Sequence, residues 1–395
     1  MPPPIGGKIG IPWPAMRVLH TSDWHVGRTF HGRDLLAEQE TVLSGLADLV
    51  DTERVDALVV SGDLYDRAVP SAEAVDTCAR VLRRIADAGA QIVITPGNHD
   101  SAPRLGAFAA FARAGGLHLR TAIANLHEPV LLEDAHGPVA FYGIPYLEPE
   151  VARHALGDPE LRGHAAVLGE AMRRIKTDLD TRKTRSVVLA HAFVIGGETS
   201  DSERTIAVGG VPHVPGSLFD GIDYAALGHL HGPQTLAEHL RYSGSPMAYS
   251  FSEARHRKSV WLVELDKHGL AGVERRELPV PRVLGTLRGH LADLLTDPAH
   301  ESEIDKFLSI ELTDQVRPID AMRRLRERFP HALHMDWLPE GGRPRVRRYS
   351  ETVKGRTDEE VACCFVEDTR NSPPTDTERA LLREALAAVA GKERE

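Results

Sequence analysis

The chain has 395 residues, more than one compact core usually organises, so we expect two or three structural units. Apolar residues make up 42% of the chain, and no apolar run is long enough to span a bilayer, which argues against a membrane segment. The formal net charge of −10 argues against a simple nucleic-acid binder, although a local basic groove, divalent cations or a partner subunit could attract phosphate.

Residues 1–15 are rich in Pro and Gly and lack the features of a signal peptide, so we expect a disordered leader, and Met16 could be the true start. Strand and helix patterns alternate from there on, which predicts an α/β layered core with parallel strands. The expected strands are Arg17–Ser22, Asp56–Ser61, Gln91–Thr95, Val139–Ile144, Ser186–Ala190, Asp223–Leu227 and Ser259–Leu265. The expected helices are Leu36–Val50, Ser71–Ala88 with Ser71 as N-cap, Leu105–Ala114 and Leu161–Thr181.

The pattern changes near Pro279–Pro281, so we place the end of the first domain, 16–280, there. A smaller α+β domain is expected at 281–355, and its last part carries the basic residues Arg343, Arg345, Arg347 and Arg348. The remaining segment, 356–395, ends in a short predicted helix, Glu378–Val389, with an apolar face.

Five polar motifs each follow a predicted strand: Asp23-Trp24-His25, Gly62–Asp66, Gly97–Asp100, Ala190-His191 and Gly228–His231. Because the carboxyl ends of parallel strands gather at one edge of a sheet, we expect these motifs to converge. In Asp-x-His and His-x-His, residues two apart in an extended segment point the same way. Glycines before Asp63, Asn98 and His229 allow tight turns that bring the backbone close.

Carboxylate, amide and imidazole groups together suit Mn²⁺, Mg²⁺, Fe²⁺ or Zn²⁺. None of the three cysteines forms a CxxC pair, which argues against a thiolate zinc site and is typical of a reducing cytoplasm. Two metals about 3.5–4 Å apart would clamp a phosphate, with Asp63 as the candidate bridging carboxylate. A histidine that binds no metal could protonate the leaving alkoxide.

The motifs DWH, GDLYD, GNHD, AH and GHLH, in this order, resemble the signature of calcineurin-like metallophosphoesterases. The flanking text, such as TSDWHVGRTFHGRDLLAEQE and GNHDSAPRL, is similar to the SbcD family of bacterial nuclease subunits. The resemblance implies a layered metallophosphoesterase sandwich with a smaller capping domain. It also implies two Mn²⁺ ions, with Mg²⁺ as the alternative. One metal would be held by Asp23, His25, Asp63 and His231, and the other by Asp63, Asn98, His191 and His229.

The same resemblance gives His99 a catalytic role beside the phosphate, without binding metal. Asp66 stands where archaeal and eukaryotic relatives place a histidine that supports the catalytic one, so we expect Asp66 to orient His99. The positive residues expected to contact DNA are Arg28, His31, Arg33, Arg104, Arg345 and Arg347. Each of these could instead belong to an ordinary solvated surface.

The implied activity is a manganese-dependent DNA phosphodiesterase, with exonuclease action on duplex ends and endonuclease action on hairpins, in recombination and repair. The implied partners are DNA, a second copy of the chain and the SMC-like ATPase SbcC, bound through the C-terminal segment. Helices Ser71–Ala88 and Leu105–Ala114 would form the dimer contact. The chain has no GxxxxGK[ST] motif, so any ATP dependence must come from elsewhere.

Two other functions share these motifs. An enzyme of the same fold could act on a small phosphodiester, a nucleotide or a phosphoprotein, although the appended domain favours DNA. A non-catalytic scaffold on this fold would be expected to have lost ligands, whereas every ligand position is filled here. The sequence leaves open the cleavage polarity, the metal used in vivo, the way ATP gates the site, and whether the segment Asp201–Arg204 contacts DNA, the partner or neither.

Overall fold

The computed structural model describes residues 15–203, 213–339, 356–370 and 372–392. Residues 1–14 of the expected leader, Arg204 and the arginines at 343, 345, 347 and 348 therefore lie outside the described residues. The chain divides into two compact units, Met1–Pro281 and Arg282–Glu395.

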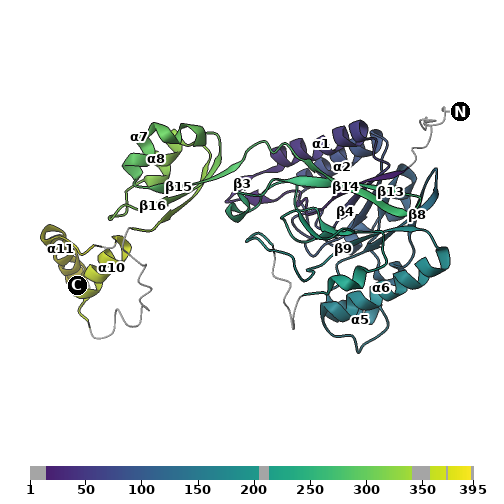
Figure 1. Cartoon of the computed structure of the whole chain (residues 1–395). Helices are drawn as coiled ribbons and strands as arrows, with labels where there is room; N and C mark the ends of the chain where they lie inside the picture. The colour runs from purple at the N-terminus through teal and green to yellow at the C-terminus, as the bar shows by residue number, and fades with distance from the viewer. Residues whose placement is uncertain (1–14, 204–212, 340–355, 371, 393–395) are drawn as a thin grey trace. The chain divides into compact units, whose positions relative to one another are not determined.

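Two six-stranded sheets form the first unit (Figure 1). In the first sheet, a parallel centre is extended on one side by an antiparallel hairpin; its order is β14 (Gly269–Glu277), β13 (Ser259–Asp266), β1 (Met16–Thr21), β4 (Ala57–Ser61), β5 (Gln91–Thr95) and β6 (Leu117–Leu119). The second sheet has antiparallel strands at both edges; its order is β11 (Gln234–Ala237), β12 (Leu240–Tyr242), β10 (Tyr224–Gly228), β9 (Arg185–His191), β8 (Gly137–Ile144) and β7 (Val130–Asp134). The expectation of parallel strands holds for the sheet centres and is wrong at these edges.

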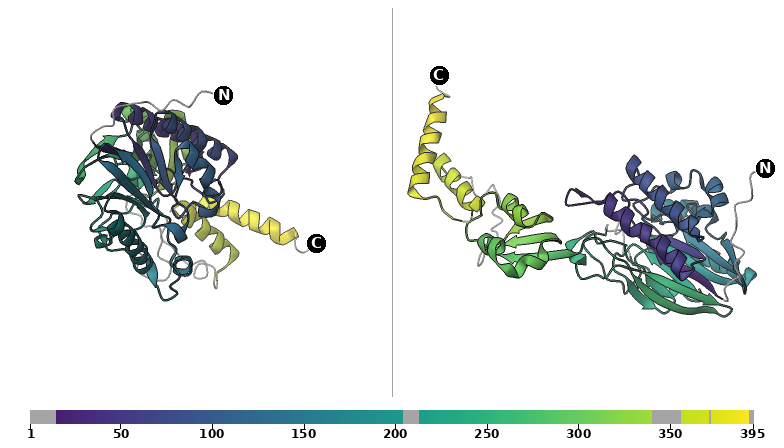
Figure 2. Two further views of the ribbon diagram at one scale, coloured as in Figure 1. Left: turned by 90° about the vertical axis from the view of Figure 1, so that its right-hand side faces the viewer. Right: turned by 90° about the horizontal axis from the view of Figure 1, so that it is seen from above.

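Helices cover the outer faces of both sheets (Figure 2). The first sheet is covered by α1 (Leu36–Glu53) and α2 (Ala72–Asp87), and Ser71 caps α2 as expected by accepting a hydrogen bond of 3.2 Å from the Ala74 N–H. The second sheet is covered by α5 (Pro149–Ala155) and α6 (Gly163–Arg182). The result is a four-layer α/β sandwich, which confirms the predicted fold class.

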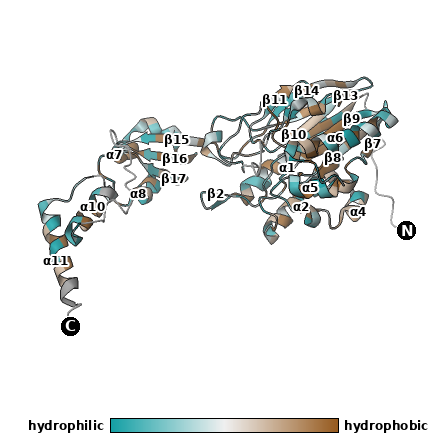
Figure 3. Cartoon of the chain, turned by 90° about the horizontal axis from the view of Figure 1, so that it is seen from below, coloured by the Kyte–Doolittle hydropathy of each residue, from teal (hydrophilic) through white to brown (hydrophobic). Residues whose placement is uncertain are grey.

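The two sheets pack face to face through a shared apolar core. Val18 and Val59 of the first sheet belong to one buried cluster with Phe141, Val187 and Tyr224 of the second. Figure 3 shows apolar residues concentrated in the strands of this unit. The central strands are buried on both faces, as the run ALVVS in β4 illustrates.

The expected helix Leu105–Ala114 is wrong. Two short helices, α3 (Ala102–Leu105) and α4 (Ala109–Ala112), stand there, followed by the 3-10 turn η1 (Arg113–Gly115). None of the residues in these turns is buried, so no apolar face holds them in one continuous helix. The backbone at Gly106, where α3 ends, lies so close to Thr121 that a Cβ atom would come within 2.3 Å of the Thr121 hydroxyl.

The second unit contains a three-stranded parallel sheet, β15 (Leu284–Gly289), β16 (Phe307–Leu312) and β17 (Ala332–Trp337), with the helices α7 (Leu291–Thr296) and α8 (Ala321–Arg328). Leu308, Ile310 and Leu325 are in its core. The segment Thr357–Arg370, which has a mixed sequence pattern, forms the helix α10 (Asp358–Arg370), and α11 (Asp376–Lys392) follows. Within the described ranges, no helix is both long enough and apolar enough to cross a membrane.

Candidate metal centre

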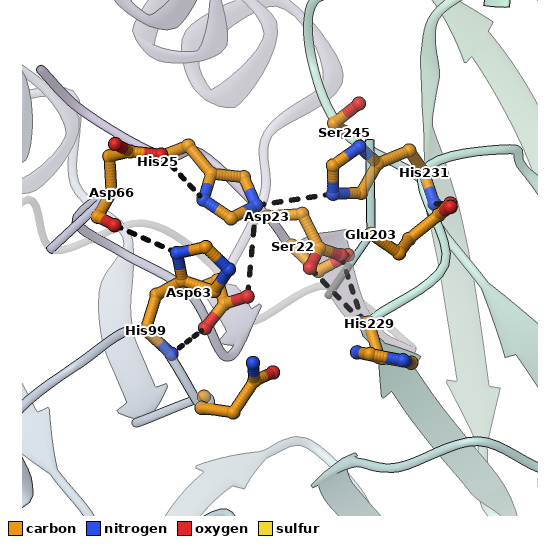
Figure 4. A network of polar contacts seen from close by, with 12 residues as sticks. Ser22, Asp23, His25, Asp63, Asp66, His99, Glu203, His229, His231 and Ser245 are labelled. Atoms are coloured by element: carbon orange, nitrogen blue, oxygen red, sulfur yellow. Dashed lines mark hydrogen bonds and ion pairs between the residues drawn. The ribbon is translucent and has the colours of Figure 1, made fainter. Parts of the chain in front are cut away.

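The structure brings the predicted site residues of the first unit together at the carboxyl ends of five strands. Asp23 and His25 follow β1, Asp63 follows β4, and Asn98 and His99 follow β5, while the other sheet contributes His191 at the end of β9 and His229 and His231 after β10. Three overlapping sets of side chains come within ligand distance of one another: Asp23, His25 and His231; His25, Asp63 and His99; Asp23, Asp63 and His191. All of the residues in these sets are buried. Figure 4 shows the side chains of Asp23, His25, Asp63, His99 and His231 gathered at one place.

Asp63 occupies the middle of this arrangement. Its Oδ2 atom lies 3.7 Å from Nε2 of His25 and 3.4 Å from Nε2 of His191. Nε2 of His25 is in turn 3.1 Å from Nε2 of His231, and Nε2 of His191 is 2.9 Å from Oδ1 of Asn98. One carboxylate oxygen thus faces two separate groups of candidate ligands, an arrangement compatible with a bridge between two metals.

The backbone at the site is strained. Four of the site residues, Asp23, His25, Asp63 and His229, have positive φ angles of 53°, 46°, 48° and 105°. Residues with side chains rarely adopt this region, and such outliers cluster at functional sites. Backbone hydrogen bonds hold these turns, since the Asp23 N–H donates to Gly62 O at 3.1 Å and the His25 N–H donates to Asp63 O at 3.0 Å.

The glycines before Asp63, Asn98 and His229 are needed for close approach, as the sequence predicted. A Cβ on Gly62 would lie 2.1 Å from Nδ1 of His191, and one on Gly97 would lie 2.1 Å from Oδ1 of Asp63. A Cβ on Gly228 would lie 1.8 Å from the carbonyl oxygen of Ser61. These three positions let loops from both sheets pack directly on the site.

The ligand set fits a divalent cation. Nδ1 of His191 lies 3.0 Å from the Ser61 carbonyl oxygen, so it carries a proton, and Nε2 faces the oxygens of Asn98 and Asp63. Burial alone would lower the pKa of His191, but the Asp63 and Asp23 carboxylates raise it to about 9. A proton on Nε2 therefore stands between these oxygens, in the position that a cation would take once the ring is deprotonated.

The pKa values of the two carboxyl groups in the site, Asp23 and Asp63, are shifted in opposite directions. Burial raises the pKa of Asp23 to about 6. Burial alone would also raise the pKa of Asp63, but His191, His25 and His99 hold it well below its usual range. Asp23 is also fixed by hydrogen bonds, because it accepts from the Ser22 hydroxyl at 2.5 Å and from the His229 N–H at 3.1 Å.

His99 is held at two points by the motif Gly62–Asp66. Its N–H donates to Oδ1 of Asp63 at 2.8 Å, and its Nδ1 donates to the backbone carbonyl of Asp66 at 2.7 Å. The Asp66 carboxylate instead lies 3.7 Å from Nδ1 of His25 and 3.7 Å from Nη1 of Arg28. The contact expected between Asp66 and His99 is therefore present, but the backbone oxygen of Asp66 makes it rather than the side chain.

The residues proposed for DNA contact differ in their surroundings. Arg28 is largely buried: it donates to the carbonyl oxygen of Ser202 at 3.0 Å, and its guanidinium lies 5.1 Å from the centre of the Tyr249 ring. His31 and Arg33 are exposed at the hairpin of β2 (Thr29–Phe30) and β3 (Arg33–Asp34). Arg104 is exposed in α3, while Arg345 and Arg347 lie outside the described residues.

Several residues around the site were not singled out from the sequence. The Asp100 carboxylate accepts the N–H groups of Leu64, Tyr65 and Gly97, and so ties the second and third motifs together. Burial raises its pKa to about 7. Asp100 is the last residue of the GNHD motif, so the motif could have pointed to this residue. Ser202, Glu203, Glu253 and Lys258 surround His231, and only the first two belong to a segment that the sequence had marked.

A basic groove that was not predicted from the sequence adjoins His231. It has a volume of about 400 Å³ and is lined by Gly232, the residue after His231, together with Arg255, His256, Arg257 and Arg275. Two acidic side chains offset part of the positive charge of the groove: Glu198 also lines it, and Glu277 lies 3.3 Å from Arg257. The basic run Arg255–Lys258 was the signal in the sequence.

Comparison with known proteins settles the family. The family described as calcineurin-like phosphoesterase matches residues 16–233, which contain all five motifs. The chain belongs to this family. A second family, described as the type 5 capsule protein repressor C-terminal domain, matches residues 280–370.

A curated relative is similar over most of its length. The SbcD subunit of the nuclease SbcCD from Staphylococcus epidermidis is 28% identical over 320 residues, covering 80% of this chain and 84% of that protein. This match, with the two families, confirms the predicted resemblance to SbcD. Among solved structures, TT1561 of Thermus thermophilus matches with a TM-score of 0.40 and 14% identity, covering 67% of this chain and 99% of that one. A dimetal phosphatase from Danio rerio matches with a TM-score of 0.38 and 14% identity, covering 68% and 99%.

Proposed function

We propose that this chain is a manganese-dependent DNA phosphodiesterase that cuts duplex ends and hairpins in recombination and repair, together with an SMC-like ATPase of the SbcC type. The observation that carries the proposal is the position of the Asp63 carboxylate between two groups of ligands. The likeness to a nuclease subunit over most of both chains supports DNA as the substrate.

In this proposal, Asp23, His25, Asp63 and His231 hold one metal and Asp63, Asn98, His191 and His229 hold the other. When bound, the metals supply Lewis-acid activation of water and neutralise charge on the phosphate oxygens. His99 acts from the protein side. Because its Nδ1 is engaged by the Asp66 carbonyl at 2.7 Å, Nε2 is the nitrogen that would give a proton to the leaving alkoxide.

The basic groove supports a long anionic substrate. The chain carries a formal charge of −10, so DNA must meet a local positive surface. Arg255, Arg257 and Arg275 offer one immediately beside a metal ligand. A small phosphodiester would need no such extension, which is why we place that function second. A non-catalytic scaffold is disfavoured because each proposed ligand is present.

Exposed apolar surface supports the proposed protein partners. Val75 of α2 is 43% exposed and lines a depression together with Leu82 and Leu105. Phe108, just before α4, and Phe111, within α4, are 73% and 80% exposed. We assign this surface to the second copy of the chain. Phe365 of α10 and Leu381 of α11 are also exposed, and we assign these helices to the ATPase.

The test is cleavage of an end-labelled DNA hairpin by the full chain in Mn²⁺, beside a generic phosphodiester. The proposal expects the wild type to cut both and Asp63→Asn to cut neither, because the shared carboxylate is lost. Hydrolysis of the generic ester by the wild type without cleavage of DNA, even with the ATPase present, would contradict a DNA function and favour a small substrate.

A further inference from the structure

We infer that Ser202 and Glu203 are positioning residues for His231 in the proposed metal centre, and that the buried pair of Glu253 and Lys258 holds Ser202 in place. This deepens the proposed function and rests on its assignment of His231 as a ligand. It also gives a role to a segment that the sequence left without one.

His231 is held at three points. Its Nδ1 lies 2.6 Å from Oγ of Ser202, its backbone N–H donates to Oε1 of Glu203 at 2.8 Å, and its carbonyl oxygen accepts from Nζ of Lys258 at 2.9 Å. Figure 4 shows Glu203 against the backbone of His231, with the imidazole directed toward His25. Both ends of the residue and its ring are therefore fixed from outside the ligand set.

The hydrogens can be assigned along this chain of contacts. Oγ of Ser202 lies 2.5 Å from Oε1 of Glu253, and Lys258 contacts the other oxygen of that carboxylate. An ionised carboxylate only accepts, so the Ser202 hydroxyl donates to it. The Ser202 oxygen must then accept from Nδ1–H of His231. This tautomer leaves the lone pair on Nε2, the nitrogen that lies 3.1 Å from Nε2 of His25.

The ion pair of Glu253 and Lys258 is buried and stabilises the contact between Ser202 and His231. The side chains of Glu253 and Lys258 are 0% and 2% exposed. Lys258 has three N–H donors and three acceptors within reach: Glu253, the His231 carbonyl and Oγ of Ser245, the last at 2.9 Å. A buried ion pair with all its hydrogen bonds satisfied is costly to break, so it gives Ser202 a fixed partner.

The ring of His25 makes a useful contrast. Its backbone carbonyl accepts from Nε2 of Gln39 at 2.7 Å. Its Nδ1, however, has no hydrogen-bond partner among the residues that the structure describes. The Asp66 carboxylate lies 3.7 Å from this nitrogen, beyond hydrogen-bond distance, whereas Nδ1 of His231 lies 2.6 Å from the Ser202 hydroxyl. Partners of this kind typically contribute about 10–100-fold to metal affinity or activity.

The experiment measures Mn²⁺ binding to the full chain by calorimetry, without DNA, for wild type, Ser202→Ala and Ser202→Thr. We expect Ser202→Ala to weaken one of the two binding events by about 10–100-fold and to lower kcat for a generic phosphodiester at limiting Mn²⁺. Ser202→Thr keeps the hydroxyl and should restore the affinity. Glu203→Gln, which keeps an acceptor oxygen, should bind nearly as the wild type, whereas Glu203→Ala should not.

Ser186→Ala is the matched control. Ser186 is also buried, and its hydroxyl donates to an acidic side chain, Asp223, at 2.9 Å, but it lies in β9 and touches no ligand. It should lower stability about as much as Ser202→Ala and leave Mn²⁺ affinity unchanged. Equal Mn²⁺ affinity in wild type and Ser202→Ala would overturn the inference, as would an equal loss in Ser186→Ala. If Ser202→Ala does not fold, failure of Glu203→Ala to weaken Mn²⁺ binding relative to Glu203→Gln would overturn it. Because no DNA is present, these outcomes are separate from failure of the DNA function.

Discussion

At the scale of single residues, carboxylate and amide oxygens of the site surround the His191 ring and favour a positive charge there. Neighbouring carboxylates raise the pKa of this ring to about 9 despite complete burial. A proton on its Nε2 offsets the charge of Asp63, whose Oδ2 lies 3.4 Å away. As a ligand, the ring must lose that proton, so metal and proton compete for the same nitrogen.

This competition predicts a pH dependence for Mn²⁺ binding. A raised histidine pKa means that the ring is protonated below about pH 9, so affinity should rise as pH increases from 6.5 to 8.5. The ceiling is about tenfold per pH unit for each proton released. Calorimetry in buffers of different ionisation enthalpy should show proton release at pH 7.5. Affinity that stays constant over this range, with no proton release, would contradict the account.

At the scale of elements, the sequence predicted the strands that lead into the site loops, and those loops, because both rest on local patterns, but it missed the strands β6, β7, β11, β12 and β14. Buried strands such as β4 have continuous apolar runs, and polar motifs follow them. The residues that support His231 could not be predicted as a group. Glu253 and Lys258 lie about 50 residues along the chain from Ser202, between β12 and β13, where the sequence has no periodicity, and only folding brings them together.

The close approach of the Gly97 backbone to Asp63 can be tested by substitution. Gly97→Ala would place a methyl group 2.1 Å from Oδ1 of Asp63, so the loop must move and carry Asn98 with it. We expect activity to fall at least about 100-fold, since small displacements at reacting groups have effects of that size. Gly45→Ala is the control, because it lies in α1 with open space around it and should stabilise the fold by about 0.5–1 kcal/mol. The measurements are phosphodiester hydrolysis and thermal unfolding. Gly97→Ala with full activity would show that the close approach has no role.

At the scale of the whole molecule, the first unit uses two sheets to make one site. Asp23, His25, Asp63 and Asn98 come from loops of one sheet, and His191, His229 and His231 come from the other. The apolar core between the sheets fixes how these edges meet. The ligands could be found from the sequence through a resemblance and through the predicted strand ends. Local patterns do not show which sheet a strand joins. The sequence therefore predicted that the strand ends lie at the edge of one parallel sheet. In the structure they come from two sheets, each with antiparallel edge strands.

The central claim is that Asp63 joins two metal positions across these sheets. The most direct measurement is the amount of Mn²⁺ bound per folded chain, for wild type and for Asp63→Asn, which has nearly the same shape without the negative charge. The account predicts two Mn²⁺ ions in the wild type, and fewer, more weakly bound ions in Asp63→Asn. One ion in the wild type, or two equally tight ions in Asp63→Asn, would contradict it.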